Sequence, residues 1–248
     1  CTNMGDELFH DLPLGESVET APGVAVERRS FLTTTAVLFA AAGLPGLARA
    51  RRLDPRRDVF DFDDFLREAL PVAKQFVADT TYAGQARYLH ALAALAVLLE
   101  DVPQPEMTSK GNGTFIGANE GGDPFNVLHW RMEPGSKIGA HPHIYGNVVT
   151  LGLAGEARIS NYEMVGARDF DTKEAFVVRR TVEQWLTPGA INLVNLERGY
   201  MHGFDAGASG ARGLDITTRI REKRPSPSLA LDKPRNADQG LFEAHWSV

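Results

Sequence analysis

Hydrophobic residues recur at helical spacing in two stretches near the start of the folded region. One stretch runs from Phe62 to Val77 and the other from Gln85 to Leu99. A three-to-four-residue period places apolar side chains on one face of an α-helix. Pro71 is expected to kink or split the first helix, because proline lacks the N–H that the helix interior needs. The pattern therefore predicts two helices ahead of the rest of the domain.

From Thr114 onward the pattern changes to short segments separated by glycine, proline and asparagine. Many of these segments alternate apolar and polar residues, which is typical of strands with one buried face. Short strands at such spacing predict an antiparallel barrel or jelly roll. The expected strands are Phe125–Met132, Asn147–Leu153, Glu156–Tyr162, Phe176–Val182, Gln184–Leu186, Ile191–Val194, Met201–Phe204 and Arg212–Thr218.

The length of 248 residues, of which 43% are hydrophobic and 23% charged, fits one substantial domain with an appendage. Four divisions are expected: a signal region over 1–50, a helical segment packing on the barrel over 51–104, the barrel over 105–221, and a C-terminal tail over 222–248. The tail is rich in proline, serine and charge, and Phe242 and Trp246 are its expected anchors. The sequence leaves a homo-oligomer open.

Charge and cysteine content exclude several classes of function. The formal net charge is -6, and no run of lysine or arginine has the density of a nucleic-acid-binding surface, so nucleic acid is not an expected partner. The single cysteine is Cys1, so the folded part has no internal disulfide, cysteine-rich zinc site or cysteine nucleophile. Any chemistry must therefore come from other residues.

The region before the helices resembles a twin-arginine export signal. It contains Arg28-Arg29, then Phe31-Leu32, a moderately apolar segment, Pro45 and the ending Ala48-Arg-Ala50. The resemblance implies export to the periplasm, with membrane contact only through the signal. Because the apolar segment is near the lower limit for spanning a bilayer, an uncleaved membrane anchor or an ordinary amphipathic helix are the alternatives.

Three histidines are the candidate metal ligands. His141 and His143 are two positions apart, so in a strand both imidazoles project to the same face. His202 lies on another expected strand and can complete one face of a coordination sphere. Imidazole binds iron, zinc and copper well. The pattern therefore predicts a metal site inside the barrel.

The surroundings of these histidines resemble the two motifs of the cupin superfamily. Residues 134–155 read Pro-Gly, five residues, His-x-His and later Gly, as in the first motif. Residues 187–202 read Thr-Pro-Gly-Ala-Ile-Asn-Leu-Val and then Gly-Tyr-Met-His, as in the second motif with two extra residues between its glycines. The first motif normally continues with a glutamate ligand. Here Asn147 or Val148 holds that place, and neither can supply an anionic ligand.

A three-histidine site without the glutamate is similar to that of the plant cysteine oxidase and cysteamine dioxygenase family. Residues 141–163, 201–206 and 211–216 resemble that family in spacing and residue type. The resemblance implies a mainly β, cupin-type barrel that binds Fe²⁺ through the three histidines and oxidises a small thiol to a sulfinic acid with O2. The family's Pro-Pro-Tyr segment is replaced by Thr217-Thr218-Arg219-Ile220, which leaves the substrate open.

Three further residues are candidates for the chemistry. By the resemblance, Asp215 lies near the metal and accepts a hydrogen bond from water or a substrate amine, with a plain strand-end role as the alternative. Tyr145 is either a hydrogen-bond donor in the cavity or an aromatic that packs a loop. If Arg131 faces inward, it can hold a substrate carboxylate.

Two other functions remain alternatives to thiol oxidation. A cupin dioxygenase could act on a carbon substrate such as a diketone or a phenolic compound. A non-catalytic cupin of the cell envelope could bind a metal or a ligand without turnover.

Overall fold

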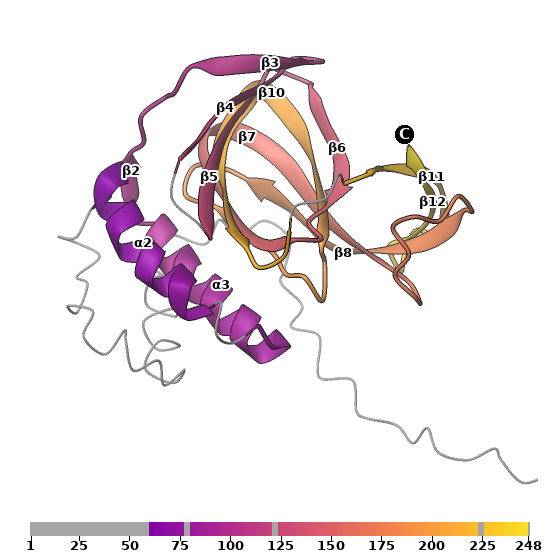
Figure 1. The fold of residues 1–248 in the computed structure, drawn as a ribbon. Coiled ribbons are helices and arrows are strands. Elements are labelled where there is room, and N and C mark those ends of the chain that lie inside the picture. Colours follow the sequence, from indigo (N-terminus) through magenta and orange to yellow (C-terminus); the bar gives the residue numbers. More distant parts are fainter. Residues whose placement is uncertain (1–59, 77–79, 121–123, 223–225, 248) are drawn as a thin grey trace, which may run out of the picture.

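A computed structural model describes residues 60–76, 80–120, 124–222 and 226–247 of the chain. The expected signal region, with its paired arginines, lies outside these residues. The described part is mainly β, with two helices at its start (Figure 1), as the sequence predicts. None of its helices combines the length and the apolar character needed to cross a membrane.

The two helices are α2 (Phe62–Phe76) and α3 (Tyr82–Ala96), within a few residues of the predicted stretches. Pro71 lies inside α2 without splitting it. α3 starts where the Thr81 hydroxyl accepts the Gly84 N–H at 3.1 Å. The short parallel strands β1 (Phe60–Asp61) and β2 (Leu99–Asp101) pair across the ends of this helical layer.

The remaining strands form one antiparallel sheet that curls into the barrel seen in Figure 1. Its order is β11-β12-β8-β7-β10-β5-β4-β3, while β6 pairs with β10 and β9 pairs with β7. The strands are β3 (Met107–Gly111), β4 (Thr114–Glu120), β5 (Phe125–Met132), β6 (Lys137–Pro142), β7 (Gly146–Met164), β8 (Phe176–Leu186), β9 (Ile191–Val194), β10 (Met201–Arg219), β11 (Ser228–Asn236) and β12 (Leu241–Ser247).

Three pairs of predicted strands are single strands in the structure. β7, β8 and β10 each run through the break that the sequence suggested. In β7 and β10 the break is a glycine, Gly155 or Gly210, with φ of 65° or 71°. A Cβ on Gly155 would collide with the carbonyl of Gly210. These glycines therefore allow two long strands to bend past each other, rather than ending them.

The C-terminal residues expected to form a tail contribute a hairpin to the sheet. β12 pairs with β8, and β11 pairs with β12. The two expected anchors pack on the barrel: the Phe242 ring lies 6.3 Å from that of Tyr162, and the Trp246 ring lies 4.8 Å from that of Phe176.

The buried hydrophobic residues of the described part form three clusters, and the alternation of side chains along the central strands places two of them on opposite sides of the sheet. One core lies between the helices and the sheet and includes Phe65, Leu92 and Leu214. The other lies on the opposite side of the sheet, inside the barrel, and includes Trp130, Ile159 and Phe204. Which of these sides a residue faces decides whether it can reach the histidines.

Candidate metal centre

Two neighbouring strands bring the three histidines together. His141 lies near the end of β6, and it is directly opposite His202 near the start of β10. His143 follows the end of β6, and its N–H donates to the carbonyl of Tyr200 at 2.8 Å. The pairing of β6 with β10 therefore fixes all three positions through main-chain hydrogen bonds.

The ligand atoms of the three histidines lie within 4.8 Å of one another. The His143 and His202 Nε2 atoms are 2.8 Å apart. Two imidazole nitrogens bound at right angles to one ion, each at about 2.1 Å, would be separated by about 3.0 Å. His143 and His202 are thus already placed as adjacent ligands of one ion, with His141 beside them.

Burial keeps these imidazoles neutral. Desolvation lowers the pKa of His141, and it lowers the pKa of His143 and His202 well below the usual value, with neighbouring histidines adding to the effect. The His141 Nδ1–H donates to the Gly139 carbonyl at 2.9 Å, which leaves its Nε2 lone pair available. Neutral imidazoles are the form that binds a metal ion.

The donor set fits a first-row divalent ion. The facing Nε2 atoms of His143 and His202 can share only one proton between them, and both are fully buried. An ion in place of that proton would use both lone pairs. Three neutral nitrogen ligands suit iron, cobalt, copper or zinc, rather than magnesium or calcium, which prefer oxygen.

The position where the cupin motif normally has its glutamate carries no ligand. The Asn147 side-chain oxygen accepts the Leu196 N–H at 3.1 Å, so this residue supports the chain between β9 and β10. Val148 is fully buried and apolar. Asn147 and Val148 therefore hold the chain and fill the core at this position.

Asp215 lies beside the histidines on the inner side of β10. Its Oδ2 is 3.9 Å from His202 Nε2, and its Oδ1 accepts the Thr150 hydroxyl at 2.7 Å. Burial raises the pKa of Asp215 to about 6, while the Thr150 hydroxyl and the Trp130 indole oppose that rise. The structure therefore brings Asp215 to the site, and its role there stays a prediction.

Tyr145 also lies near the site. Its ring is half-buried, and the ring centroid is 6.3 Å from that of His143. Burial and the Asp215 carboxylate raise the pKa of Tyr145, so the phenol keeps its proton at neutral pH. A role as a hydrogen-bond donor remains a prediction.

Arg131 is not brought to the histidines. It is exposed, and its guanidinium lies 4.1 Å from the centre of the Phe115 ring. His129 lies two positions away on the same side of β5, and its ring centroid is 5.6 Å from that of Phe62 of α2. This side of β5 therefore faces the helices. Trp130 points the other way, into the barrel. The inward orientation required for a substrate-carboxylate role is therefore not observed.

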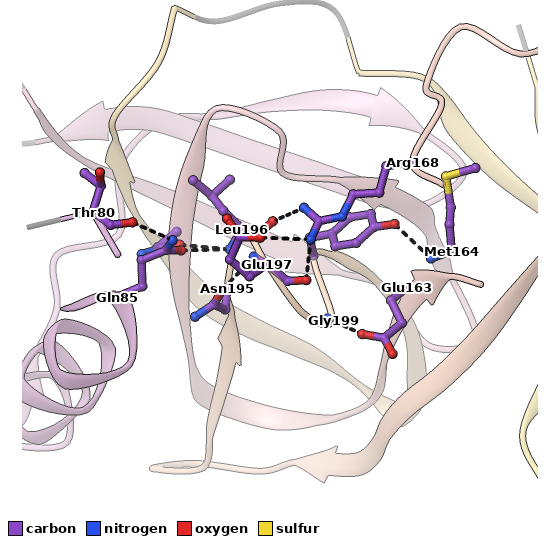
Figure 2. Close-up of polar contacts among 11 residues, drawn as sticks. Thr80, Gln85, Glu163, Met164, Arg168, Asn195, Leu196, Glu197 and Gly199 are labelled. Atoms are coloured by element: carbon purple, nitrogen blue, oxygen red, sulfur yellow. Dashed lines mark hydrogen bonds and ion pairs between the residues drawn. The ribbon is translucent and has the colours of Figure 1, made fainter. Parts of the chain in front are cut away.

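Sequence reasoning missed the residues that hold the chain between β9 and β10. Figure 2 shows that Gln85 of α3 and Arg168 of the β7–β8 loop both reach this segment. Their contacts depend on how distant loops meet in the fold. No spacing or motif in the sequence marks them.

Comparison with known proteins gives likenesses among solved structures. No protein-family model matches the sequence, and no curated protein matches it. KdgF from Halomonas sp. is 13% identical, with 47% of this chain and 89% of that chain covered and a TM-score of 0.36. An RmlC-like cupin from Shewanella frigidimarina is 18% identical, with 48% and 87% covered and a TM-score of 0.35. An oxalate oxidase is 16% identical, with 48% and 58% covered and a TM-score of 0.36.

The fold is a cupin-type barrel. Its antiparallel sheet curls until β6 pairs with β10, which closes the barrel around the histidines. Inside the barrel, three histidines form a group that can hold a metal ion.

Proposed function

We propose that the protein is a metal-dependent dioxygenase that binds Fe²⁺ through His141, His143 and His202 and oxidises a small thiol to its sulfinic acid with O2. One observation carries the proposal. Three neutral imidazoles converge, two of them buried and that of His141 partly buried, while the position of the usual glutamate ligand holds Asn147, which is engaged elsewhere.

This donor set favours an anionic substrate. The three ligands carry no negative charge and occupy only one face of the coordination sphere, and the Asp215 carboxylate beside them offsets at most one of the two positive charges of the ion. When bound, iron would supply Lewis acidity that lowers the pKa of a thiol and the redox chemistry that O2 needs. A thiolate is one anion that matches this chemistry, and the resemblance of residues 141–163, 201–206 and 211–216 to the thiol dioxygenases is what favours a thiol over a diketone or phenolic substrate.

The surrounding residues would orient the substrate and exclude water. Asp215 is fixed at Oδ1 by Thr150, which leaves Oδ2 to accept a hydrogen bond from a polar group of the substrate. Tyr145 would donate its phenolic proton as a hydrogen bond from the rim of the site. Phe204 packs against the His202 ring at 4.8 Å and shields one side of it from solvent.

The test is oxygen uptake by the iron-loaded protein with cysteine, cysteamine, mercaptopropionate and peptides with N-terminal cysteine. We expect uptake with at least one thiol and a sulfinate product by mass spectrometry, both lost in His202→Ala. If the protein instead cleaves a diketone or a phenolic compound, its substrate is a carbon compound and not a thiol. Bound zinc with no turnover on any substrate would instead indicate a non-catalytic metal-binding protein.

The proposal includes export through the Arg28-Arg29 segment, which would let the protein fold around its metal before leaving the cytoplasm. Replacing both arginines by lysine in the full chain should leave the protein inside the cell. Unchanged periplasmic yield of that variant would contradict export by this route.

A further inference from the structure

Residues 195–200 connect β9 to β10, and the first five of them, 195–199, lead through Tyr200 into the strand that carries His202. Side chains from three other parts of the fold bind their main chain (Figure 2). Gln85 of α3 accepts the Leu196 N–H at 3.2 Å. Glu163 of β7 accepts the Gly199 N–H at 3.4 Å. We call residues 195–199 the 195–199 connection.

Arg168 makes the largest number of these contacts. Its guanidinium donates to the carbonyls of Leu196 and Glu197, both at 2.6 Å, and pairs with the Glu197 carboxylate at 3.0 Å. It also lies 4.6 Å from the centre of the Tyr200 ring. A planar guanidinium can make these contacts at the same time, which an ammonium cannot.

The contacts to the two carbonyls are the ones that matter. Arg168 and Glu197 are each more than a third exposed in their side chains, so their ion pair contributes little. Charge-assisted hydrogen bonds to main-chain carbonyls fix the path of the backbone itself. They hold the 195–199 connection against the β7–β8 loop.

Tyr200 links this connection to the histidines. Its hydroxyl accepts the Met164 N–H at 2.9 Å, and its carbonyl accepts the His143 N–H at 2.8 Å. His202 follows two residues later on β10. A shift of Tyr200 would therefore move His143 and His202 relative to each other, although their Nε2 atoms must stay close to bind one ion.

We propose that Arg168 is a positioning residue for the metal centre: by holding the Leu196 and Glu197 carbonyls and covering Tyr200, it fixes the spacing of His143 and His202. It touches no ligand directly. The inference rests on metal binding by the three histidines, as in the proposed function, and is independent of the substrate.

The test measures cobalt(II) affinity by competition with a chelator, at a temperature where each variant is folded. Arg168→Met keeps an apolar stem over Tyr200 but removes the donors, so its Kd should rise about 10- to 100-fold, the usual effect of losing a residue that orients a ligand. Arg168→Lys should weaken binding less. Glu197→Gln, which spares both carbonyl contacts, should bind cobalt as the wild type does.

Arg180 provides a matched control. It also pairs with a glutamate, Glu183, and lies 5.6 Å from the centre of an aromatic ring, that of Phe242, but it does not touch the 195–199 connection. Arg180→Met should leave cobalt affinity unchanged. A purely structural role for Arg168 would lower the free energy of unfolding of the metal-free protein and leave the Kd of the folded protein alone.

The outcomes distinguish a failure of the metal site from a failure of the positioning role of Arg168. Wild-type protein that binds no cobalt would refute the metal site and with it the proposed function. Wild-type binding with an unchanged Kd in folded Arg168→Met would overturn only the positioning role. If Arg168→Met does not fold, an unchanged Kd in Arg168→Lys overturns it as well.

Discussion

Lowering the pH should destabilise the metal-free protein through the buried histidines. Burial lowers the pKa of His143 and His202 well below the usual value, so the folded state resists their protonation. The unfolded chain takes up these protons below about pH 6.5. Since the unfolded state then binds more protons, the free energy of unfolding falls as the pH falls.

The magnitude follows from proton linkage. Between about pH 7.5 and about pH 5.5, a histidine that stays neutral in the folded protein costs roughly 1–2 kcal/mol, or about 3 kcal/mol for His143 and His202 together. Asp215 acts in the opposite direction, because its pKa is raised to about 6 in the folded protein. Asp215 offsets about 1 kcal/mol of that loss over the same range, which leaves a net loss of about 2 kcal/mol. His141, whose pKa is also lowered, adds to the loss.

The assay is urea unfolding of chelator-treated protein at the two pH values. The variant His143→Gln/His202→Gln should lose most of the destabilisation on acidification and keep only the part due to His141, whatever its stability at neutral pH. His90→Gln, which removes an exposed imidazole from α3, should keep the full wild-type loss. Equal pH sensitivity in the double variant and the wild type would show that these histidines are not held neutral by burial.

Two further substitutions test the packing of the sheet, one on its helix side and one inside the barrel. Tyr88→Phe removes the partner of the buried Thr218 hydroxyl and should lower the free energy of unfolding by about 1–2 kcal/mol in urea unfolding, whereas the same change at the exposed Tyr82 should have little effect. Gly213→Ala places a Cβ against a tryptophan ring and a main-chain carbonyl and should cost about 1–3 kcal/mol by thermal unfolding. A methyl on Gly139 meets nothing within 4 Å; a comparable loss in Gly139→Ala would contradict the packing argument.

The sequence predicted strands well where alternation is regular and poorly where glycine interrupts it. Phe125–Met132 and Ile191–Val194 are predicted exactly. The predicted strands stop at Leu153 and Phe204, before Gly155 and Gly210, because sequence alone does not distinguish a glycine that ends a strand from one that lets two strands cross. β6, which carries His141, lacks the regular apolar alternation that marks a strand and was not predicted as one.

The site shows the same division. The two-residue spacing of His141 and His143 and the cupin-like position of His202 were enough to predict that the three meet. His143 follows the end of β6, and its N–H bond to the Tyr200 carbonyl holds it there. The inward or outward direction of Arg131 was not predictable. Arg131 shares one face of β5 with His129, while Leu128 and Trp130 share the other, and each face contains a residue that can be buried. Arg168 acts through main-chain carbonyls of a distant segment, and only the folded chain reveals such contacts.

The central claim is that His141, His143 and His202 bind one metal ion. The most direct measurement is the metal content of the protein after anaerobic reconstitution with Fe²⁺ and removal of free metal. We predict one ion per chain in the wild type and loss of that ion in folded His202→Ala, whose remaining histidines cannot complete the site. Full retention of iron by the variant, or no iron in the wild type, would contradict the assignment.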